Sequence, residues 1–435
     1  MIKYKNSMYN IYLGKTVKNE TIVYNSYSGA IGLFDSVGIA DMENANISSK
    51  YLEDMISQGF LVYDSLNEYE RVMLHHKTYI YNNFPEKMQF TIAPTLACPL
   101  SCYYCFEKNH SNYIMDKETM DKVYEYIVNM LKQNINIKRL HITWFGGEPL
   151  VGKNIIYDIG LKLYNYCKKN KIVYTAKILT NGILLDRNIL EDMVNKHVIT
   201  AIQFTLDGNE NDYVEIKKGT TEQYKKLKKL ISISPDIIET YVRLNVTNSN
   251  YHTLLKEVID ILDKRKNQNN NHLIFYAMPV IDYTNCNEKR MTEEEMNRFR
   301  AELKDILKKY NVLKRHVTSS ARTTAAFCGA MRLCNLTFGP QGEMYRCENL
   351  IGDTTNIIGN VYEGRFYNKQ DFQLPEGKLY EKCKECNFLP VCWAGCPVHR
   401  IVYKKDFDCN SLKQQIISGL LDKLKGGIET DEMLF

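Results

Sequence analysis

Apolar segments alternate with amphipathic segments along the middle of the chain. Six short apolar runs predict strands at residues 88–94, 140–145, 172–179, 199–206, 241–246 and 273–280. Between them, apolar residues recur every three or four positions, as Met120, Val123 and Ile127 do. They predict helices at 117–133, 153–169, 187–196, 221–232, 252–266 and 293–310. Six strand–helix units predict an α/β fold with a parallel sheet, arranged as a partial (β/α)6 barrel like that of TIM-barrel enzymes.

The first 87 residues follow a different pattern. Strands are predicted at 11–13, 21–24 and 60–63, with a helix at 48–58 that Ser48 or Ser49 caps and Gly59 ends. This order predicts a small α+β module similar to a winged helix. The module resembles the leader-peptide recognition domains of peptide maturases, which bind a peptide by adding it as a strand to an exposed sheet edge. The alternative is that residues 1–87 cap the barrel.

The sequence pattern changes again near residue 316. Regular periodicity fades, and eight of the thirteen cysteines follow. A loop-rich segment dense in cysteine is one that metal centres can hold together. We therefore expect three domains: an N-terminal module at 1–87, a barrel at 88–315 and a cysteine-rich, metal-binding domain at 316–435.

Charge and hydropathy narrow the class of protein. The net charge is +5 over 435 residues, with both signs interspersed, which gives nucleic-acid binding no support. No apolar run reaches the roughly 18 residues that a membrane span needs, and the N-terminus lacks the layout of a signal peptide. We expect a cytoplasmic protein with no membrane or nucleic-acid partner. In that reducing compartment, cysteines favour metal binding over disulfides.

The first cysteine cluster has an informative spacing. Cys98, Cys102 and Cys105 form a C-x3-C-x2-C loop, with the aromatic Tyr104 before the last cysteine. Three thiolates hold three irons of a [4Fe–4S] cube and leave the fourth iron open for another ligand. A zinc loop is the alternative, but zinc usually takes four protein ligands in C-x2-C pairs.

This loop resembles that of the radical SAM superfamily. The resemblance implies that the open iron chelates the amino and carboxylate groups of S-adenosylmethionine. It also implies that the reduced cluster cleaves this cofactor and releases a 5′-deoxyadenosyl radical, which abstracts a hydrogen atom from the substrate.

Several segments that follow predicted strands resemble the family's cofactor-binding motifs, and barrel enzymes place their sites at these strand ends. The Gly-Gly-Glu-Pro segment resembles the motif that contacts the methionine amino group, and the segments after the third and fourth strands resemble those that contact the ribose and carboxylate. The segment at Asp207 is equally compatible with a simple turn. Relatives often carry an arginine where this chain has Lys217, so Lys217 and Arg243 are both candidates for the carboxylate. The predicted cofactor-binding residues are Tyr104, Gly146, Gly147, Glu148, Pro149, Thr180, Asn181, Thr205, Asp207, Lys217 and Arg243.

The C-terminal cysteines resemble the SPASM extension of radical SAM peptide-modifying enzymes, whose C-x2-C-x5-C-x3-C core is complete here. Eight cysteines suffice for two fully ligated [4Fe–4S] clusters; two structural zincs are the alternative. By resemblance to sulfatase-maturing members, Cys328, Cys334, Cys347 and Cys396 bind auxiliary cluster I, and Cys383, Cys386, Cys392 and Cys409 bind auxiliary cluster II. Cys167 and Cys286 are left over, and we expect them to be buried small hydrophobes.

The chain is therefore expected to be a radical S-adenosylmethionine oxidoreductase with three [4Fe–4S] clusters. Its expected substrate is a ribosomally made precursor peptide with a leader, in which it installs a thioether or another side-chain crosslink. The alternatives are a sulfatase-maturing enzyme that oxidises Cys or Ser to formylglycine, and an iron–sulfur electron carrier. An electron donor such as flavodoxin or ferredoxin is the expected protein partner. Glu348, which follows Cys347, is either a catalytic base or an exposed surface carboxylate.

Overall fold

A computed structural model describes residues 3–82, 85–105, 107, 112–280, 291–312, 325–377, 379–404 and 408–425. By their contacts, the described residues divide into two compact units. Unit 1 takes in residues from 1–82, 318–333 and 372–435, and unit 2 takes in residues from 83–317 and 334–371. Each unit is described by itself.

Unit 2 is built on six parallel strands that lie side by side in chain order. They are β6 (Lys87–Ile92), β7 (Arg139–Trp144), β8 (Val173–Thr180), β9 (Ala201–Leu206), β10 (Glu239–Val246) and β11 (Leu273–Pro279). The side chains that alternate along each strand point to opposite faces. On one face, Phe90, Ile142, Ile202 and Val242 are buried in the main hydrophobic core. The predicted parallel sheet is confirmed.

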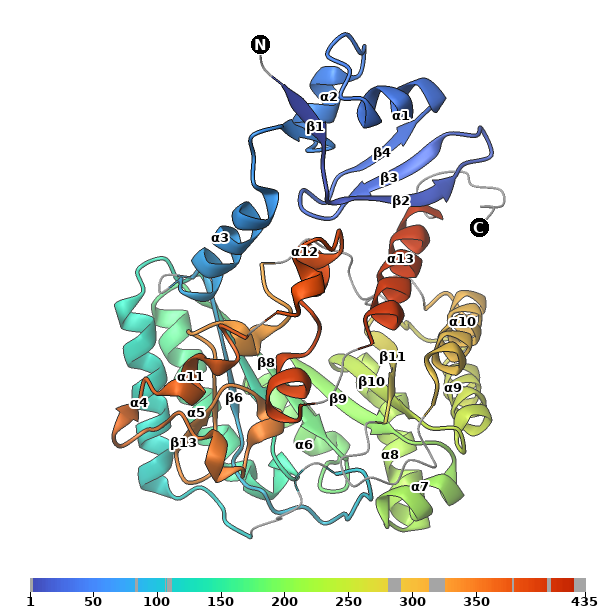
Figure 1. The fold of residues 1–435 in the computed structure, drawn as a ribbon. Helices are drawn as coiled ribbons and strands as arrows, with labels where there is room; N and C mark the ends of the chain where they lie inside the picture. Colours follow the sequence, from blue (N-terminus) through green and yellow to red (C-terminus); the bar gives the residue numbers. More distant parts are fainter. Residues whose placement is uncertain are drawn as a thin grey trace. The chain divides into compact units, whose positions relative to one another are not determined.

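Helices cover this apolar face of the sheet (Figure 1). They are α4 (Lys117–Gln133), α5 (Lys153–Lys169), α6 (Arg187–Asn195), α7 (Glu210–Lys217), α8 (Thr221–Ile233), α9 (Tyr251–Lys264) and α10 (Glu293–Lys309). The bounds of α4 and α5 match the prediction. The Asp116 carboxylate starts α4 by accepting a hydrogen bond from the backbone N–H of Thr119. Six strand–helix units therefore form the partial (β/α)6 fold.

The segment after Cys334 extends the same sheet. Strand β12 (Leu336–Phe338) pairs in parallel with β6, and β13 (Glu343–Tyr345), β14 (Gly359–Asn360) and β15 (Gly364–Arg365) follow in antiparallel order. A short helix, α11 (Lys369–Gln373), ends this segment. The fully buried carboxylate of Asp371 pairs with Arg346 and Arg365 and fixes these strands to one another. The predicted domain boundaries at 87 and 315 stay predictions.

Unit 1 joins the two ends of the chain. Strand β1 (Tyr4–Asn6) pairs with β5 (Leu61–Tyr63), and β2 (Asn10–Lys15), β3 (Thr21–Asn25) and β4 (Ile31–Phe34) form an antiparallel sheet. Its helices are α1 (Ser36–Glu43), α2 (Leu52–Ser57), α3 (Glu68–Ile80), α12 (Leu389–Cys392) and α13 (Cys409–Lys425). The N-terminal residues are thus a mixture of strands and helices, as expected, and their separate module at 1–87 with its likeness to a winged helix stays a prediction.

One predicted helix start is wrong. The helix expected from residue 48 begins at Leu52, and neither Ser48 nor Ser49 is its N-cap residue. Instead, the Ser49 hydroxyl accepts a hydrogen bond from the N–H of Tyr51, two residues on, which is a local turn that competes with helix. Gly59 follows the helix with φ +82°, as a terminating glycine does.

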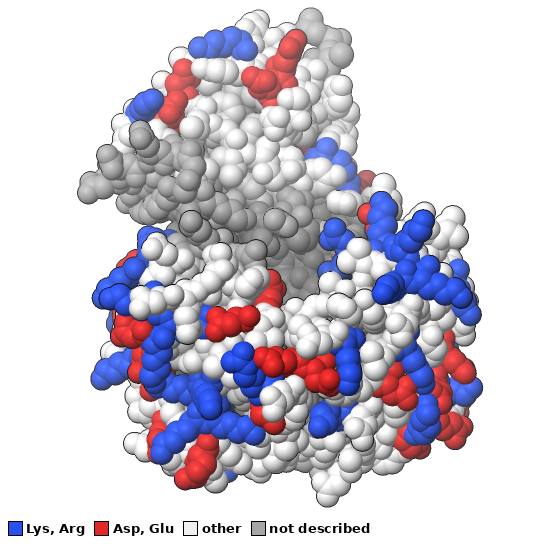
Figure 2. Space-filling view, turned by 180° about the vertical axis from the view of Figure 1, so that it is seen from behind, with Lys and Arg blue, Asp and Glu red and all other residues white. Residues whose placement is uncertain are grey.

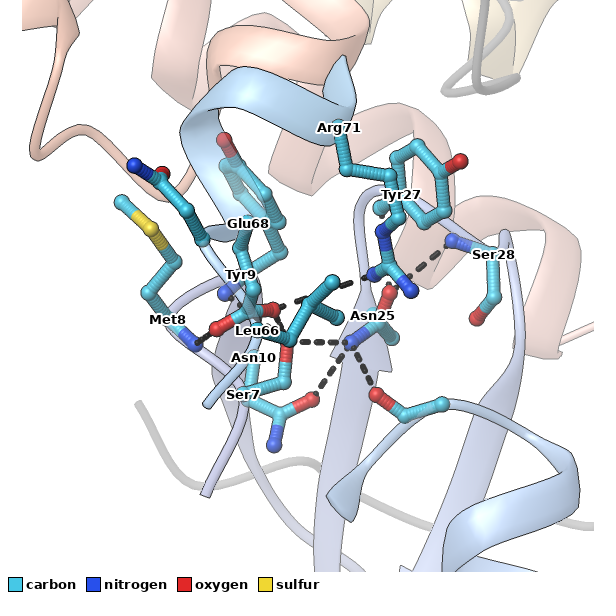
Figure 3. Close-up of polar contacts among 12 residues, drawn as sticks. Ser7, Met8, Tyr9, Asn10, Asn25, Tyr27, Ser28, Leu66, Glu68 and Arg71 are labelled. Atoms are coloured by element: carbon cyan, nitrogen blue, oxygen red, sulfur yellow. Dashed lines mark hydrogen bonds and ion pairs between the residues drawn. The ribbon is translucent and has the colours of Figure 1, made fainter. Parts of the chain in front are cut away.

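A buried polar network ties the first strands to α3 (Figure 3). The Glu68 carboxylate accepts hydrogen bonds from the Ser7 hydroxyl at 2.5 Å and the Met8 N–H at 3.0 Å. The Asn25 side chain donates to Ser7 at 3.2 Å and to Asn10 at 2.9 Å. Because these groups are buried, each bond satisfies a polar atom that water does not reach.

The core of unit 1 is shared by residues from both ends of the chain. Ile11 and Leu13 of β2 and Tyr24 of β3 pack with Phe388 and with Leu420 of α13. The Asn387 amide also donates to the backbone oxygen of Asn10 at 3.2 Å. The N-terminal sheet and the segment that carries Cys383, Cys386 and Cys392 thus form one packed body.

Charged side chains of both signs are interspersed on the face of unit 2 that Figure 2 shows. Some charged side chains form ion pairs between neighbouring helices, such as Lys162 of α5 with Asp121 of α4 at 2.8 Å. Among the described residues, no helix has the length and apolar character that a membrane crossing requires.

Candidate active site

The three-cysteine loop lies after β6 and rests on the end of α7. The N–H groups of Ser101 and Tyr103 donate to the carbonyl oxygens of Lys217 and Ile216, both at 3.2 Å. The last carbonyls of a helix have no partner within the helix, so α7 offers ready acceptors. The N–H of Cys105 closes the loop on the carbonyl oxygen of Cys102 at 3.0 Å. These bonds set the shape of the loop between its cysteines.

The three thiols lie near one another, as the ligands of one iron–sulfur cube must. Burial raises the pKa of Cys102 to about 12 and that of Cys105 to about 11, and the thiols lie within electrostatic range of one another. Cluster binding therefore has to release protons from these thiols. Among the described residues, no three side chains converge on one point as ligands of a single ion do. A cube has no such requirement, because each cysteine binds a different iron.

The Gly-Gly-Glu-Pro segment is clamped to the same loop. Gly146 has φ +115°, and a Cβ on Gly147 would lie 2.3 Å from the carbonyl oxygen of Leu96. The N–H of Glu148 donates to the carbonyl oxygen of Ala97 at 2.9 Å, and Pro149 opens a short 3-10 turn. Only glycine allows this approach of two backbones. The segment is thereby fixed beside Cys98.

Glu148 is the centre of a buried network. Its carboxylate accepts from the Thr180 hydroxyl at 2.7 Å, from the Asn181 N–H at 2.8 Å and from the Leu150 N–H at 3.1 Å. Burial raises the pKa of Glu148 to about 7, and no cation of the described residues forms an ion pair with it. The Asn181 amide nitrogen also lies 3.7 Å from the sulfur of Cys98. A buried carboxylate without a cation fits a ligand that carries an ammonium group.

A second buried network joins the ends of β9 and β10 to the cysteine loop. The Lys217 ammonium lies 2.8 Å from the carboxylate of Asp207 and donates to the Thr205 carbonyl oxygen at 2.9 Å and hydroxyl at 2.6 Å. The Tyr104 hydroxyl donates to Asp207 at 2.6 Å, and the Asn245 amide donates to Asp207 at 3.1 Å and to Tyr104 at 2.9 Å. Asp207 is thus a network hub, and Asn245 is a member that the sequence did not single out.

Lys217 and Arg243 differ in what surrounds them. The Lys217 ammonium is held by two hydrogen bonds to Thr205 and by its ion pair with Asp207. Arg243 lies in register with Thr205 on the neighbouring strand, and within the described residues its guanidinium has no hydrogen bond or ion pair. Its Nε atom is buried and unpartnered. Of the two cations, Lys217 already has an anionic partner and Arg243 has none within the described residues, so Arg243 is the better candidate for a carboxylate.

Replacing Lys217 with methionine is expected to destabilise the enzyme by about 3–5 kcal/mol, because the Asp207 carboxylate is left buried and unpaired. Circular dichroism of the iron-loaded protein measures the change as a lower apparent melting temperature. Lys196→Met is the matched control, since Lys196 pairs with Asp192 at 2.9 Å on an exposed surface and its loss costs at most about 1 kcal/mol. Equal shifts in the two variants would contradict the prediction, and Lys217→Met combined with Asp207→Asn should recover part of the loss.

The C-terminal cysteines fall in both units. Cys383, Cys386, Cys392 and Cys409 all belong to unit 1. Burial raises the pKa of Cys392, and the other three cysteines lie close enough that their charges raise it further. This proximity fits a shared cluster. Of the other set, Cys328 and Cys396 belong to unit 1, and Cys334 and Cys347 to unit 2. The two ligand sets stay predictions.

The remaining predicted residues have definite places. Glu348 follows β13, is exposed, and lies 3.9 Å from the sulfur of Cys347. Cys167 is fully buried in the core of unit 2, as expected. Cys286 lies outside the described residues.

Together, a partial (β/α)6 sheet and a three-cysteine loop that follows its first strand define an iron–sulfur enzyme of the α/β class. Residues 92–258 match the family model of the Radical SAM superfamily. The chain thus carries a radical SAM domain and is an enzyme that uses S-adenosylmethionine for radical chemistry. The family's cofactors are a [4Fe–4S] cluster and S-adenosylmethionine.

Curated relatives include a cyclopropyl synthase and a sulfatase-maturating enzyme. The radical SAM cyclopropyl synthase TigE of Paramaledivibacter caminithermalis is 27% identical over 213 residues, which are 44% of this chain and 40% of TigE. The match therefore spans less than half of TigE. The serine-type anaerobic sulfatase-maturating enzyme of Klebsiella aerogenes is 23% identical over 328 residues, 70% of this chain and 78% of that enzyme.

Solved structures share the fold. The structure of anSMEcpe with bound AdoMet has a TM-score of 0.58 at 16% identity, covering 78% of this chain and 98% of that one. Streptococcus suis SuiB, bound to its precursor peptide SuiA, has a TM-score of 0.57 at 15% identity, covering 93% of this chain and 99% of SuiB. The neighbours are SPASM-type radical SAM enzymes, and the chain has their fold.

Proposed function

We propose that this enzyme modifies a ribosomally made precursor peptide by forming a thioether or another side-chain crosslink. The observation that carries the proposal is coverage: the likeness to SuiB, which binds a precursor peptide, extends over 93% of this chain. The likeness to anSMEcpe extends over 78%. Because the shared fold extends over nearly the whole of SuiB, we infer that the two enzymes act on substrates of the same class. We propose that the module of residues 1–87 binds the leader of that peptide as an additional strand on an exposed sheet edge.

The residues around the cysteine loop would hold the cofactors. Cys98, Cys102 and Cys105 would bind the first [4Fe–4S] cluster, and the eight C-terminal cysteines two more. When bound, the first cluster and S-adenosylmethionine supply a 5′-deoxyadenosyl radical. Glu148 would receive the methionine ammonium, which supplies the positive charge that this buried carboxylate lacks. Thr205 and Arg243 would bind the carboxylate, while Lys217 and Asp207 hold the end of β9 in place.

A crosslink removes two hydrogens from the peptide, one as a hydrogen atom and the other as a proton and an electron. Glu348 is the candidate proton acceptor, because its exposed carboxylate follows Cys347 and lies within electrostatic range of Lys177 on β8. The auxiliary clusters supply an electron acceptor. Flavodoxin or ferredoxin is the proposed donor of the electron that starts each turnover.

Sulfatase maturation is the second candidate, favoured by the match to the Klebsiella aerogenes enzyme over 70% of this chain. Mass spectrometry separates the two. The iron-loaded enzyme is incubated without oxygen with S-adenosylmethionine, a reductant and a candidate precursor peptide. Loss of two hydrogens with sulfur retained supports crosslinking, and conversion of Cys to an aldehyde supports sulfatase maturation. Intact clusters that yield no 5′-deoxyadenosine would instead indicate an electron carrier and overturn both.

A further inference from the structure

The inner face of the sheet in unit 2 is polar. We define it as the face opposite the helices, to which Thr175, Lys177, Gln203, Tyr241 and Arg243 belong. Their neighbours in sequence, such as Ile178, Phe204 and Val242, are buried in the core under the helices. Because side chains alternate along a strand, the residues of the inner face cannot join that core. This face carries Lys177, which is part neither of the hydrophobic core nor of the networks around Glu148 and Asp207.

Lys177 has few partners for a mostly buried cation. Its ammonium donates to the Gln203 side-chain oxygen at 3.3 Å and lies 5.4 Å from the centre of the Tyr241 ring. Within the described residues, no carboxylate forms an ion pair with it. A charged group removed from water is costly unless it is paired and hydrogen-bonded. One long hydrogen bond and one aromatic ring offset only part of the cost of removing the Lys177 ammonium from water.

Charged groups of both signs lie near Lys177. Burial lowers the pKa of Lys177, and the charge of Arg243 lowers it further, while Glu348 and Glu239 act in the opposite direction. The Glu239 carboxylate already accepts the Tyr241 hydroxyl. Two cations, Lys177 and Arg243, therefore share the inner face without an ion-pair partner in the described part of the chain.

We propose that Lys177 binds a carboxylate of the substrate, so that the peptide carries an acidic side chain or a free C-terminus close to the residue that is modified. The proposal rests on the proposed function, since the anions of an unmodified peptide are carboxylates. The methionine carboxylate of S-adenosylmethionine is the other carboxylate that Lys177 could bind. Position separates the two: Arg243 pairs in register with Thr205, whereas Lys177 pairs with Ala201, farther from the strand ends that carry the cofactor motifs.

Binding of short peptides to the iron-loaded enzyme tests this assignment. The enzyme is saturated with S-adenosylmethionine, kept without reductant so that no turnover occurs, and titrated with acetyl-Gly-Asp-Gly-amide. The matched probe is acetyl-Gly-Asn-Gly-amide, and acetyl-triglycine with a free or an amidated C-terminus tests the terminal carboxylate. Saturation-transfer NMR measures the weak affinities that probes of this size have. We expect at least one carboxylate probe to bind about tenfold or more tightly than its amide, as a charge-assisted hydrogen bond provides.

Variants then assign the preference to one side chain. Lys177→Met should abolish the preference for the carboxylate, Lys177→Arg should keep part of it, and Lys225→Met, an exposed lysine of α8, should leave it intact. The affinity for S-adenosylmethionine should be unchanged in Lys177→Met. Equal binding of carboxylate and amide probes, no measurable binding of any probe, or a preference that survives Lys177→Met would overturn the proposal. A tenfold loss of cofactor affinity in Lys177→Met would assign the lysine to S-adenosylmethionine instead. None of these readouts needs turnover, so failure of the proposed function is detected separately, by the absence of 5′-deoxyadenosine.

Discussion

Replacing Cys102 with alanine is expected to abolish 5′-deoxyadenosine formation and to remove about four iron atoms per chain, because a cube with two of its three protein ligands is not retained. Cys102 is the most informative of the three cysteines. Its thiol is largely buried, and its neighbours Ser101 and Tyr103 hold the loop on α7 through their N–H groups. The loop keeps these bonds in the variant, so the expected loss is one of iron and not of fold. Iron analysis and chromatography of the anaerobic reaction check both parts.

Cys167→Ala is the matched control. It makes the same chemical change in the core of unit 2, away from the loop, and the iron content and activity should stay at wild-type values even though a small cavity costs some stability. If Cys102→Ala kept its full iron content while Cys167→Ala lost some, the assignment of the first cluster to the three-cysteine loop would be wrong.

Much of unit 2 could be predicted from the sequence because its signals are local. The apolar stripe of α4 and the Asp116 cap define that helix within the segment itself. The cofactor motifs also converge as expected: Glu148 and Thr180 follow different strands and meet by a hydrogen bond of 2.7 Å. Parallel strands bring their carboxyl ends to one edge, so the order of the elements alone implies the meeting.

Features that depend on distant contacts could not be predicted in this way. Helix α7 has eight residues and a weak apolar stripe, and it begins after a segment that the sequence equally allows to be a simple turn. The roles of Asp207 and Lys217 appear only when α7 folds back and forms a buried ion pair. In unit 1, one hydrophobic cluster contains both Ile11 and Leu420, which lie some four hundred positions apart in the sequence. The periodicity of neither segment predicts this packing.

Polar residues within the predicted strands indicate that one face of the sheet is polar. Lys177, Gln203 and Asn245 each interrupt a predicted apolar strand, and all three lie in the networks of the sheet's inner face or strand ends. A strand that is buried on both faces has no place for such residues. Their presence predicts that one face of the sheet surrounds a polar site, although it does not say which partner each residue takes.

Arg243 and Lys217 have different partners, so substitutions of the two residues should affect cofactor affinity differently. Arg243→Ala is expected to weaken S-adenosylmethionine binding by about tenfold to a hundredfold, as loss of a charge-assisted pair does. Arg243→Lys should recover only part of the affinity, because a lysine offers a point charge and not a planar fork. Equilibrium dialysis against the unreduced, iron-loaded enzyme measures the dissociation constant without turnover, and electron paramagnetic resonance of the reduced cluster reports cofactor contact independently.

The matched control is Arg187→Ala, which removes an arginine that pairs with Glu191 on the outer surface of α6 and should leave cofactor affinity unchanged. Lys217→Met provides the decisive contrast. The Lys217 ammonium is held by Thr205 and Asp207. The main effect of Lys217→Met should therefore be on the melting temperature, and cofactor affinity should fall only as far as the end of β9 is displaced. If Lys217→Met instead lost cofactor affinity more steeply than Arg243→Ala at a temperature where both variants remain folded, Lys217 would give up one of its protein partners to bind the carboxylate. Arg243 would then be the residue whose unpaired guanidinium still needs a ligand.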